Sequence, residues 1–459
     1  MFESDTIAAI STALGNSGIN IIRISGEDSF RVIKEIFKKG KSKSEFDVDN
    51  YDSHTIHYGY IVDENEVVDE VMVSVFKAPN SYTTENVIEI NCHGSSYIAK
   101  KILKVLVKHQ VRIAKPGEFS KRAFLNGRID LSQAEAVMDL IQSQNEYSAK
   151  SSLNQLSGSL SDRIKKIRED ILYEVAFIES ALDDPEHYSL DGYNEELEGK
   201  IRNCFSQVEG LISSFSKGRI ISEGIKTVIA GRPNAGKSSL MNNLLNEDKA
   251  IVTDIPGTTR DVIEYSVNIG KLTLNLIDTA GIHDTKDIIE KIGIEKSFES
   301  IDMAGLVLYV IDSSDDFNDE DLKLYEKIKS KPHIVILNKS DITNDFINSD
   351  IFKDSVTIRY STVDGTGFDE LISTIENMFY ENDIDVENEI YISNLRHYEL
   401  LKLAKDSLNN VIMAIDSDLS EDMVTIDMMD AYTYLGEIIG ETVTDDLVDK
   451  IFSEFCMGK

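Results

Sequence analysis

The sequence predicts a multidomain chain that combines α/β and all-α parts. We expect an N-terminal α+β domain, a helical domain built from two separated segments, and an α/β domain with a mainly parallel sheet inserted between them. Three observations predict this: early runs of β-branched residues, two stretches with apolar residues three and four apart, and continuous apolar runs alternating with helical patterns between those stretches. The length of 459 residues suits about three domains. We place the boundaries at 1–118, 119–222, 223–380 and 381–459.

The N-terminal domain is expected to be a sheet with helices. Strands are predicted at 18–26, 68–76 and 87–91, where β-branched residues are frequent and glycines bound the first run. Helices are predicted at 29–38 and 98–107 from their apolar spacing. This mixture is typical of an α+β domain.

Amphipathic helices dominate two stretches far apart in the chain. The first is marked by apolar residues spaced three and four apart, at Ile164, Ile167, Ile171, Val175 and Ile178 and again at Ile201, Phe205, Val208 and Ile212. The pattern returns near the end of the chain, at Leu401, Ala404 and Leu408. An apolar helix face needs a partner, so we expect the two segments to pack together. Two independent helical domains are the alternative.

The inserted region alternates strands and helices. Strands are expected at 226–230, 272–277, 306–311, 333–337 and 356–360, and helices at 238–245, 289–300 and 367–379. Continuous apolar strands between helices indicate a mainly parallel sheet covered on both faces.

The charge is strongly acidic, with a formal net charge of −34. This argues against generic polyanion binding, because affinity for nucleic acids is largely phosphate neutralisation. Charge is nevertheless polarised along the chain: residues 95–128 contain nine Lys or Arg and one acid, Glu118, whereas 381–459 contain nineteen acids and five bases. The basic stretch is either a solvated helix face or a local contact with a polyanion.

Cysteine usage and hydropathy predict a cytoplasmic protein. Three cysteines, Cys92, Cys204 and Cys456, are too few for a disulfide framework and show no metal-ligand spacing. The longest apolar runs are far shorter than the roughly 18–20 residues of a membrane span, and we find no signal-peptide pattern at the start. The last four residues lack a prenylation pattern, so we do not expect lipidation at Cys456.

A phosphate-binding loop is the strongest motif. Residues 231–238 fit G-x-x-x-x-G-K-[ST], follow a predicted strand and open a predicted helix. Backbone N–H groups of such a loop surround phosphates at a helix N-terminus. Lys237 would reach the β- and γ-phosphates, and the Ser238 hydroxyl would ligate Mg²⁺.

Further motifs follow in the order of a GTPase. Thr258 and Thr259 can ligate Mg²⁺ and sense the γ-phosphate, and Asp278-Thr-Ala-Gly281 ends a strand where a Walker-B aspartate stands. Residues 338–341, Asn-Lys-Ser-Asp, resemble the guanine-recognition motif of translation-factor-type GTPases, in which the aspartate accepts hydrogen bonds from guanine N1–H and the 2-amino group. Ser361-Thr362 stands where that family usually has Ser-Ala. The inserted domain is therefore expected to be a Ras-like P-loop GTPase domain.

The residue after the Asp-Thr-Ala-Gly run is Ile282, where Ras-type enzymes place a glutamine that orients water. Isoleucine cannot hydrogen-bond, so another group must orient the attacking water. The downstream candidates are His283, Asp284, Asp287 and Glu290.

The chain resembles, over essentially its whole length and in the same domain order, the MnmE (TrmE) family of tRNA modification GTPases. The motifs that carry the resemblance lie at 22–26, 116–126, 231–239, 253–261, 291–295 and 456–459. The chain departs from the family pattern at 13–17, at 183–187, at His283 and at Met457.

The resemblance implies a GTP site. Its residues would be Asn234, Ala235, Gly236, Lys237, Ser238, Ser239, Thr253, Asp254, Ile255, Pro256, Gly257, Thr258, Thr259, Asp278, Thr279, Ala280, Gly281, Asn338, Lys339, Asp341, Ser361 and Thr362. Asn234 and the main chain of Thr253, Ile255 and Thr258 would hold K⁺, and Ser238 with Thr259 would hold Mg²⁺. The catalytic candidates are Lys237, Glu290, which would align the attacking water, and Cys456, which would lie near the modification site.

The resemblance also implies a folate site and partners. Arg23, Glu89, Arg128 and Lys459 would bind 5-formyltetrahydrofolate or a related one-carbon folate. The N-terminal domain would form a homodimer, G domains would meet when GTP is bound, and the FAD-dependent enzyme MnmG would join to modify carbon 5 of the wobble uridine in certain tRNAs. The product would be an aminomethyl or carboxymethylaminomethyl group.

Two other functions remain as alternatives. A ribosome-assembly GTPase that binds rRNA would share the GTPase domain, but such proteins typically append a basic RNA-binding domain, whereas residues 381–459 carry a charge of −14. A membrane-associated signalling GTPase would need an anchor, and we find none.

Overall fold

Two β-sheets, one in each of two compact units, organise the described part of the chain. The structure is a computed structural model. It describes residues 5–13, 15–184, 186–187, 192–245, 264–270, 272–277, 300–342, 349–379, 389–417, 421–456 and 458. The chain divides into a first unit, residues 1–138, 156–188 and 425–459, and a second unit, residues 139–155 and 189–424.

The first unit contains a mixed sheet of the order β4-β3-β5-β6-β7-β2-β1-β8 among the described residues. Neighbouring strands are antiparallel except β1 and β8, which are parallel. The strands are β1 (Ile7–Ile10), β2 (Ile19–Ser25), β3 (Phe37–Lys39), β4 (Ser44–Glu45), β5 (Thr55–Asp63), β6 (Glu66–Phe76), β7 (Val87–His93) and β8 (Arg112–Ile113), with a short 3-10 helix, η1, at Val48–Asn50.

Helices α1 (Ser29–Ile36) and α2 (Ser96–Lys108) cover one face of this sheet. Val32, Ile33 and Ile102 from the helices are buried in one core with strand residues such as Ile22 and Ile90. Because side chains alternate along a strand, the strand residues next to Ile22 and Ile90 point to the opposite face of the sheet. That opposite face carries the two folate candidates of the sheet, Arg23 on β2 and Glu89 on β7, as well as exposed apolar side chains on β5 and β6.

These elements confirm the predicted α+β domain and correct some of its details. The helix predicted at 29–38 ends at Ile36, because Phe37 and Lys38 are extended and pair with β5. Strand β5 is not among the predicted strands, because its partly exposed His and Tyr residues obscure its apolar alternation. Its Gly59 is required by packing, since a Cβ there would lie 2.2 Å from the carbonyl oxygen of Lys38.

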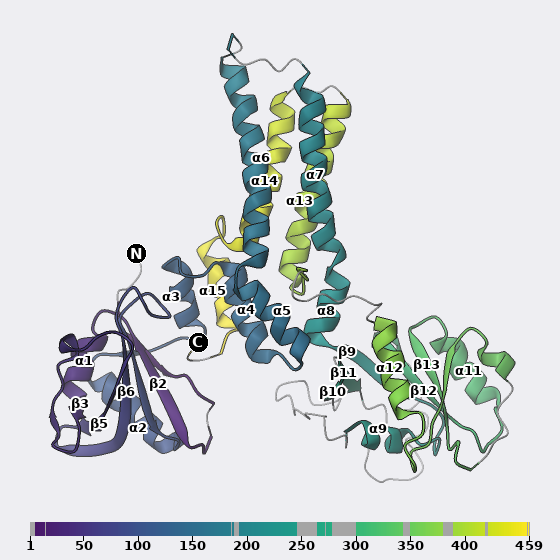
Figure 1. The fold of residues 1–459 in the computed structure, drawn as a ribbon, viewed down its shortest axis with the longest axis horizontal. Helices are drawn as coiled ribbons and strands as arrows, with labels where there is room; N and C mark the ends of the chain where they lie inside the picture. Colours follow the sequence, from purple (N-terminus) through teal and green to yellow (C-terminus); the bar gives the residue numbers. More distant parts are fainter. Residues whose placement is uncertain are drawn as a thin grey trace. The chain divides into compact units, whose positions relative to one another are not determined.

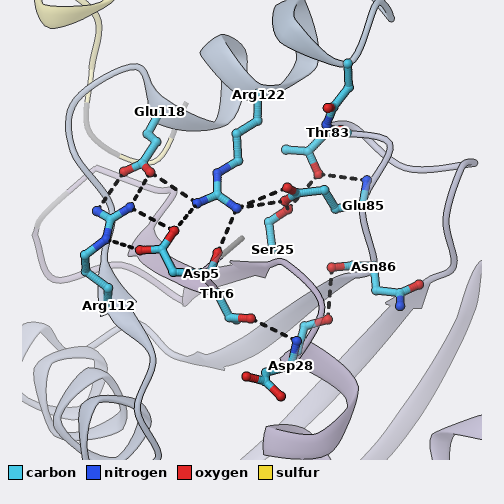
Figure 2. Close-up of polar contacts among 12 residues, drawn as sticks. Asp5, Thr6, Ser25, Asp28, Thr83, Glu85, Asn86, Arg112, Glu118 and Arg122 are labelled. Atoms are coloured by element: carbon cyan, nitrogen blue, oxygen red, sulfur yellow. Dashed lines mark hydrogen bonds and ion pairs between the residues drawn. The ribbon is translucent and has the colours of Figure 1, made fainter. Parts of the chain in front are cut away.

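A cluster of charged side chains fixes α3 (Glu118–Leu125) to the edge of the sheet (Figure 2). Arg122 on α3 donates to Asp5 at 2.8 Å and to both Glu85 oxygens at 3.1 Å. Arg112 on β8 donates to Glu118 at 3.0 Å and also binds Asp5. Two guanidinium groups thus share three carboxylates that come from distant parts of the sequence.

The remaining helices of the first unit belong to both helical segments. They are α4 (Leu131–Gln142), α6 (Ser159–Asp183), α14 (Glu421–Ile439) and α15 (Asp445–Ser453). Leu131, Ala134 and Met138 of α4 share a core with Val448 and Phe452 of α15.

Helices α6 and α14 lie side by side (Figure 1), joined by Arg168. The Arg168 side chain donates to the carbonyl of Tyr432 at 3.1 Å and pairs with Glu441. A Cβ at Gly436 would lie 2.9 Å from this guanidinium, so glycine allows the close approach.

The second unit contains a sheet of the order β10-β11-β9-β12-β13-β14 among the described residues. Only the β10–β11 pair is antiparallel, which confirms the predicted mainly parallel sheet. The strands are β9 (Ile225–Ala230), β10 (Glu264–Ile269), β11 (Leu272–Ile277), β12 (Leu306–Asp312), β13 (His333–Asn338) and β14 (Val356–Arg359).

Helices pack on both faces of this sheet, as predicted. Helices α9 (Lys237–Leu245) and α12 (Phe368–Phe379) share one core with it, and α11 (Asp319–Ile328) shares the other, next to a short 3-10 helix, η2, at Ser349–Phe352. The helix predicted at 289–300 lies outside the described residues except at residue 300.

The second unit also pairs helices from the two helical segments. Its helices include α5 (Glu146–Leu156), α7 (Tyr193–Ser213), α8 (Phe215–Glu223) and α13 (Leu395–Asp416). Helices α7 and α13 run side by side (Figure 1), with an ion pair of 2.9 Å between Lys405 and Glu209. The Phe215 and Tyr398 rings stack at 4.1 Å. The separated segments therefore pack together, and the alternative of two independent helical domains is wrong.

In the part of the chain that the structure describes, no helix is both long and apolar enough to cross a bilayer.

The charge cluster predicts a pH-dependent stability. Hydrogen bonds from Arg112 hold the pKa of Asp5 below its ordinary value. Burial opposes ionisation of Glu118, but hydrogen bonds from Arg112 and from the Lys115 N–H outweigh it, so the pKa of Glu118 is also lowered. Groups with lowered pKa stabilise the folded state above their unfolded pKa, about 4 to 4.5, and this contribution is lost as the pH falls through their folded pKa.

We therefore expect Glu118→Gln to destabilise the protein by about 2 kcal/mol at pH 7, because a hydrogen bond to a charged group contributes roughly 1.5–3 kcal/mol. In thermal melts of the full chain, the gap to the wild type should narrow between pH 6 and pH 3. Glu66→Gln, which breaks an exposed pair with Lys101, is the control and should cost below about 0.5 kcal/mol. A gap that stays constant with pH would contradict the assignment.

Candidate functional site

The phosphate-binding loop joins β9 to α9 and has room for glycine alone at two positions. Gly231 has a φ of 149°, and a Cβ there would lie 2.2 Å from the carbonyl oxygen of Val310 on β12. Gly236 has a φ of 100°, and its Cβ would lie 2.0 Å from the Asn338 side-chain nitrogen. The loop therefore packs closely against β12 and β13, and its backbone leads directly into the N-terminus of α9.

Lys237, the first residue of α9, turns back over this loop. Its ammonium donates to the carbonyls of Gly231 at 2.8 Å and Arg232 at 2.7 Å. Burial lowers the pKa of Lys237. A phosphate at the loop would favour the charged form by direct attraction. Ser238 and Ser239 are exposed in the first turn of the helix, where their hydroxyls are accessible to a ligand.

The Asn-Lys-Ser-Asp motif follows β13 and lies against the loop. The buried Asn338 donates from its side chain to the carbonyl of Ala235 at 2.8 Å, while its side-chain oxygen has no partner among the described residues. The Ser361 hydroxyl, after β14, donates to the Asp341 carboxylate at 2.8 Å. Thr362 is tied to α9, because its carbonyl accepts a bond of 3.3 Å from Asn243. The base-recognition candidates are thus connected to the phosphate loop.

The sequence analysis missed Asp312, the residue that orients Lys339. Lys339 pairs with Asp312 at the end of β12. Burial opposes ionisation of Asp312, but hydrogen bonds from Lys339 and Ser314 outweigh it and lower its pKa. The available signal was its place directly after the apolar run 306–311, at the carboxyl edge of a parallel sheet.

Arg232 in the phosphate loop is a second missed residue. Its guanidinium pairs at 2.9 Å with the buried Asp321 of α11 and donates at 3.0 Å to the carbonyl of Asp316. These contacts anchor the loop to α11 and to the segment before it.

The other predicted nucleotide and ion ligands lie outside the described residues. These are Thr253, Asp254, Ile255, Pro256, Gly257, Thr258, Thr259, Asp278, Thr279, Ala280 and Gly281, together with Glu290. Asn234 is described, and has a φ of 66° in the phosphate loop.

In the first unit, the structure brings together two folate candidates. Arg23 and Glu89 are directly opposite on β2 and β7, and their side chains form an ion pair of 2.9 Å. Arg23 also donates to the carbonyl of Gly458 at 3.4 Å, as does the Ser11 hydroxyl at 3.1 Å. The chain end is thus held at this pair, although Lys459 itself lies outside the described residues.

Arg128, a third folate candidate, contacts Tyr82. Its guanidinium donates to the Tyr82 carbonyl at 2.8 Å and lies 4.9 Å from the centre of the Tyr82 ring. Tyr82 and Arg128 line a cavity of about 480 Å³ with His54, Phe76, Pro79, Asn80, Ser81, Thr84, Asn126 and Gly127. Cys456 is exposed, and its carbonyl accepts from the Gly117 N–H at 3.3 Å.

The basic stretch 95–128 is largely used inside the fold. Lys101 and Lys108 on α2 pair with Glu66 and Asp63 at 2.8 and 2.6 Å. Arg112 and Arg122 belong to the charge cluster, and Lys121 pairs with Asp449. Most of these cations already have carboxylate partners, which favours a structural role over a polyanion-binding surface.

The packing of Gly231 makes a specific prediction for nucleotide binding. Gly231→Ala should weaken GTP binding at least about tenfold, because a strained backbone costs roughly 1–2 kcal/mol before the clash with Val310 is counted. Titration with a fluorescent GTP analogue measures this. Gly210→Ala on α7, where a Cβ meets nothing within 4 Å, is the matched control and should bind normally. Equal affinity of both variants would show that the loop does not need this close approach.

Comparison with known proteins covers the whole chain. One family model, described as the MnmE helical domain, matches residues 131–456, and another, the GTP-binding protein TrmE N-terminus, matches residues 6–128. The tRNA modification GTPase MnmE of Lachnoclostridium phytofermentans is 51% identical over 462 residues, covering 100% of both chains. The protein of that name from Clostridioides difficile is 46% identical, again covering 100% of both.

Among solved structures, the G domain of the T. maritima FeoB iron transporter is 29% identical, covers 33% of this chain and 96% of its own, and has a TM-score of 0.26. The match to relatives from end to end, together with the two family models, decides the assignment. The chain belongs to the MnmE (TrmE) family of tRNA modification GTPases.

Proposed function

We propose that this tRNA modification GTPase is activated by K⁺ and works with the FAD-dependent partner MnmG. Together they would add an aminomethyl or carboxymethylaminomethyl group at carbon 5 of the wobble uridine in certain tRNAs, with a one-carbon unit from formyl-tetrahydrofolate. One observation carries this best: a single chain holds both a guanine-type nucleotide site and an Arg23–Glu89 pair that meets the chain end.

The nucleotide site supports GTP as the substrate. The Asp341 carboxylate can accept from guanine N1–H and the 2-amino group, a pair of donors that adenine lacks, and Ser361 holds that carboxylate in place. Lys237 and the N-terminus of α9 would bind the phosphates. Ser238 would ligate Mg²⁺ with Thr259, and this ion would neutralise charge on the phosphates. Glu290 would align the attacking water.

The K⁺ proposal rests on Asn234 and the family resemblance. Asn234 would hold the ion with the main chain of Thr253, Ile255 and Thr258, and the bound cation would offset negative charge that develops during phosphate transfer. The exposed side chain of Asn234, carried by the phosphate loop, supports this role.

Asn234→Gly tests the K⁺ ligand without straining the loop, since glycine adopts the φ of 66° freely. We expect GTP binding to persist while single-turnover hydrolysis in K⁺ falls at least about tenfold, toward the wild-type rate in Na⁺, because one removed electrostatic contact typically costs tenfold or more. If the variant keeps the full difference between K⁺ and Na⁺ buffers, Asn234 does not hold the ion.

The residues of the first unit fit a reduced folate chemically. The pterin ring presents an amide and amino edge that suits the Glu89 carboxylate, and the glutamate tail of folate suits Arg23, Arg128 or Lys459. The cavity of about 480 Å³ beside Arg128 lies within the size range of small-molecule sites. The folate would supply a one-carbon unit. The residues of the chain would bind and orient it, and Cys456 would lie near the reaction.

A homodimer through the N-terminal domain is part of the proposal. The sheet face opposite α1 and α2 exposes Ile56 (66%), Met72 (46%) and Tyr58 (38%) on neighbouring strands. Apolar side chains gathered on one sheet face are typical of an interaction surface. GTP-dependent contact between G domains, a cytoplasmic location and the domain boundaries at 118, 222 and 380 complete the proposal.

The proposed reaction is tested in cells that lack this protein. A nucleoside digest of bulk tRNA, analysed by mass spectrometry, should show loss of the carbon-5 side chain on wobble uridines. Wild-type protein should restore it, and Lys237→Ala should not, because the phosphate contact is removed. An unchanged digest, with MnmG present, would instead favour the ribosome-assembly alternative.

A further inference from the structure

Both arginines of the candidate folate site approach the ring of Tyr82. Its ring centre is 5.3 Å from the guanidinium carbon of Arg23 and 4.9 Å from that of Arg128. Both distances are within the range of a cation–π interaction. The Tyr82 carbonyl accepts from Arg128 at 2.8 Å, and its hydroxyl bonds to the buried Ser120 of α3 at 2.8 Å. One residue therefore contacts both cations and α3.

Two residues that follow Tyr82, Thr83 and Glu85, bond to the charge cluster and to Ser25 (Figure 2). The Glu85 carboxylate accepts from Arg122 at 3.1 Å and from the Ser25 hydroxyl at 2.6 Å. The Thr83 hydroxyl bonds to Ser25 at 2.6 Å, and both side chains are fully buried. The Thr83 carbonyl accepts from Asn126 at 2.7 Å. These bonds fix the backbone that directly follows the tyrosine.

Tyr82 also lines the cavity of about 480 Å³ while its ring contacts Arg23 of the Arg23–Glu89 pair. Arg128 lines that cavity, and Arg23 does not. A ligand in the cavity that also contacted Arg23 would therefore lie close to the Tyr82 ring.

We propose that Tyr82 is a positioning residue of the folate site: its ring orders the Arg23 and Arg128 side chains, which are then ready to meet an anionic and hydrogen-bonding ligand. This rests on the proposed folate binding. Arginine loses side-chain freedom when it binds a ligand, and an aromatic surface that has already ordered it reduces that loss. The ring is the active part, and the hydroxyl serves the packing against Ser120.

The test is calorimetric titration of the full chain with 5-formyltetrahydrofolate. Tyr82→Leu should bind at least about fivefold more weakly, because each cation–π contact contributes roughly 0.5–1 kcal/mol. Tyr82→Phe, which keeps the ring, should stay within about twofold of the wild type by the same argument. Tyr97→Leu, an exposed tyrosine on α2 that does not line the cavity, is the matched control and should bind normally.

Melting temperature and GTP hydrolysis, measured on each variant, separate positioning from folding, because a positioning role changes folate affinity alone. If Tyr82→Leu does not fold, the same titration is made with Tyr82→Met, whose long side chain occupies the space of the tyrosine without an aromatic ring. Wild-type affinity in the Leu or Met variant would overturn the role of Tyr82 and leave folate binding intact. Absence of binding by the wild-type chain would overturn both.

Discussion

The shared charges of Arg112 and Arg122 are the interaction on which the first unit depends. Two guanidinium groups and three carboxylates, Asp5, Glu85 and Glu118, are drawn from the chain start, a loop, β8 and α3. Pairing satisfies each charge where burial would otherwise be costly. With α3 fixed, its Gly117 N–H can meet the Cys456 carbonyl, and the chain end reaches the sheet. The two ends of the sequence are thereby brought to one site.

The second unit depends on the direction of its strands. Because β9, β12, β13 and β14 are parallel, their carboxyl ends meet at one edge, where loops gather that are more than a hundred residues apart. The bond from Asn338 to Ala235 joins the phosphate loop to the base-recognition loop directly. The two candidate nucleotide-binding loops are therefore held together by a direct contact.

In both units, a polar side chain connects segments that are distant in the sequence. Arg168 does this between α6 and α14, and Lys405 between α7 and α13. In each unit a helix from before the inserted domain packs on one from after it. The insertion of a GTPase domain within a helical domain is stable because each helix finds its apolar partner after the chain returns.

The sequence by itself determined the local features: the phosphate loop and its glycines, the parallel strands, and the helical periodicity on both sides of them. These follow from spacing and residue type, so Lys237, Asn338 and Asp341 could be found without a fold. Only the tertiary structure decided which partners these residues have. The contacts of Asp312 with Lys339, Arg232 with Asp321, and Tyr82 with two arginines join residues 27, 89, 46 and 59 positions apart. The same is true of the basic stretch 95–128, whose positive charges could have served a polyanion contact as far as the sequence shows. Its carboxylate partners come from other strands and helices, and a pattern along one chain segment contains no information about them.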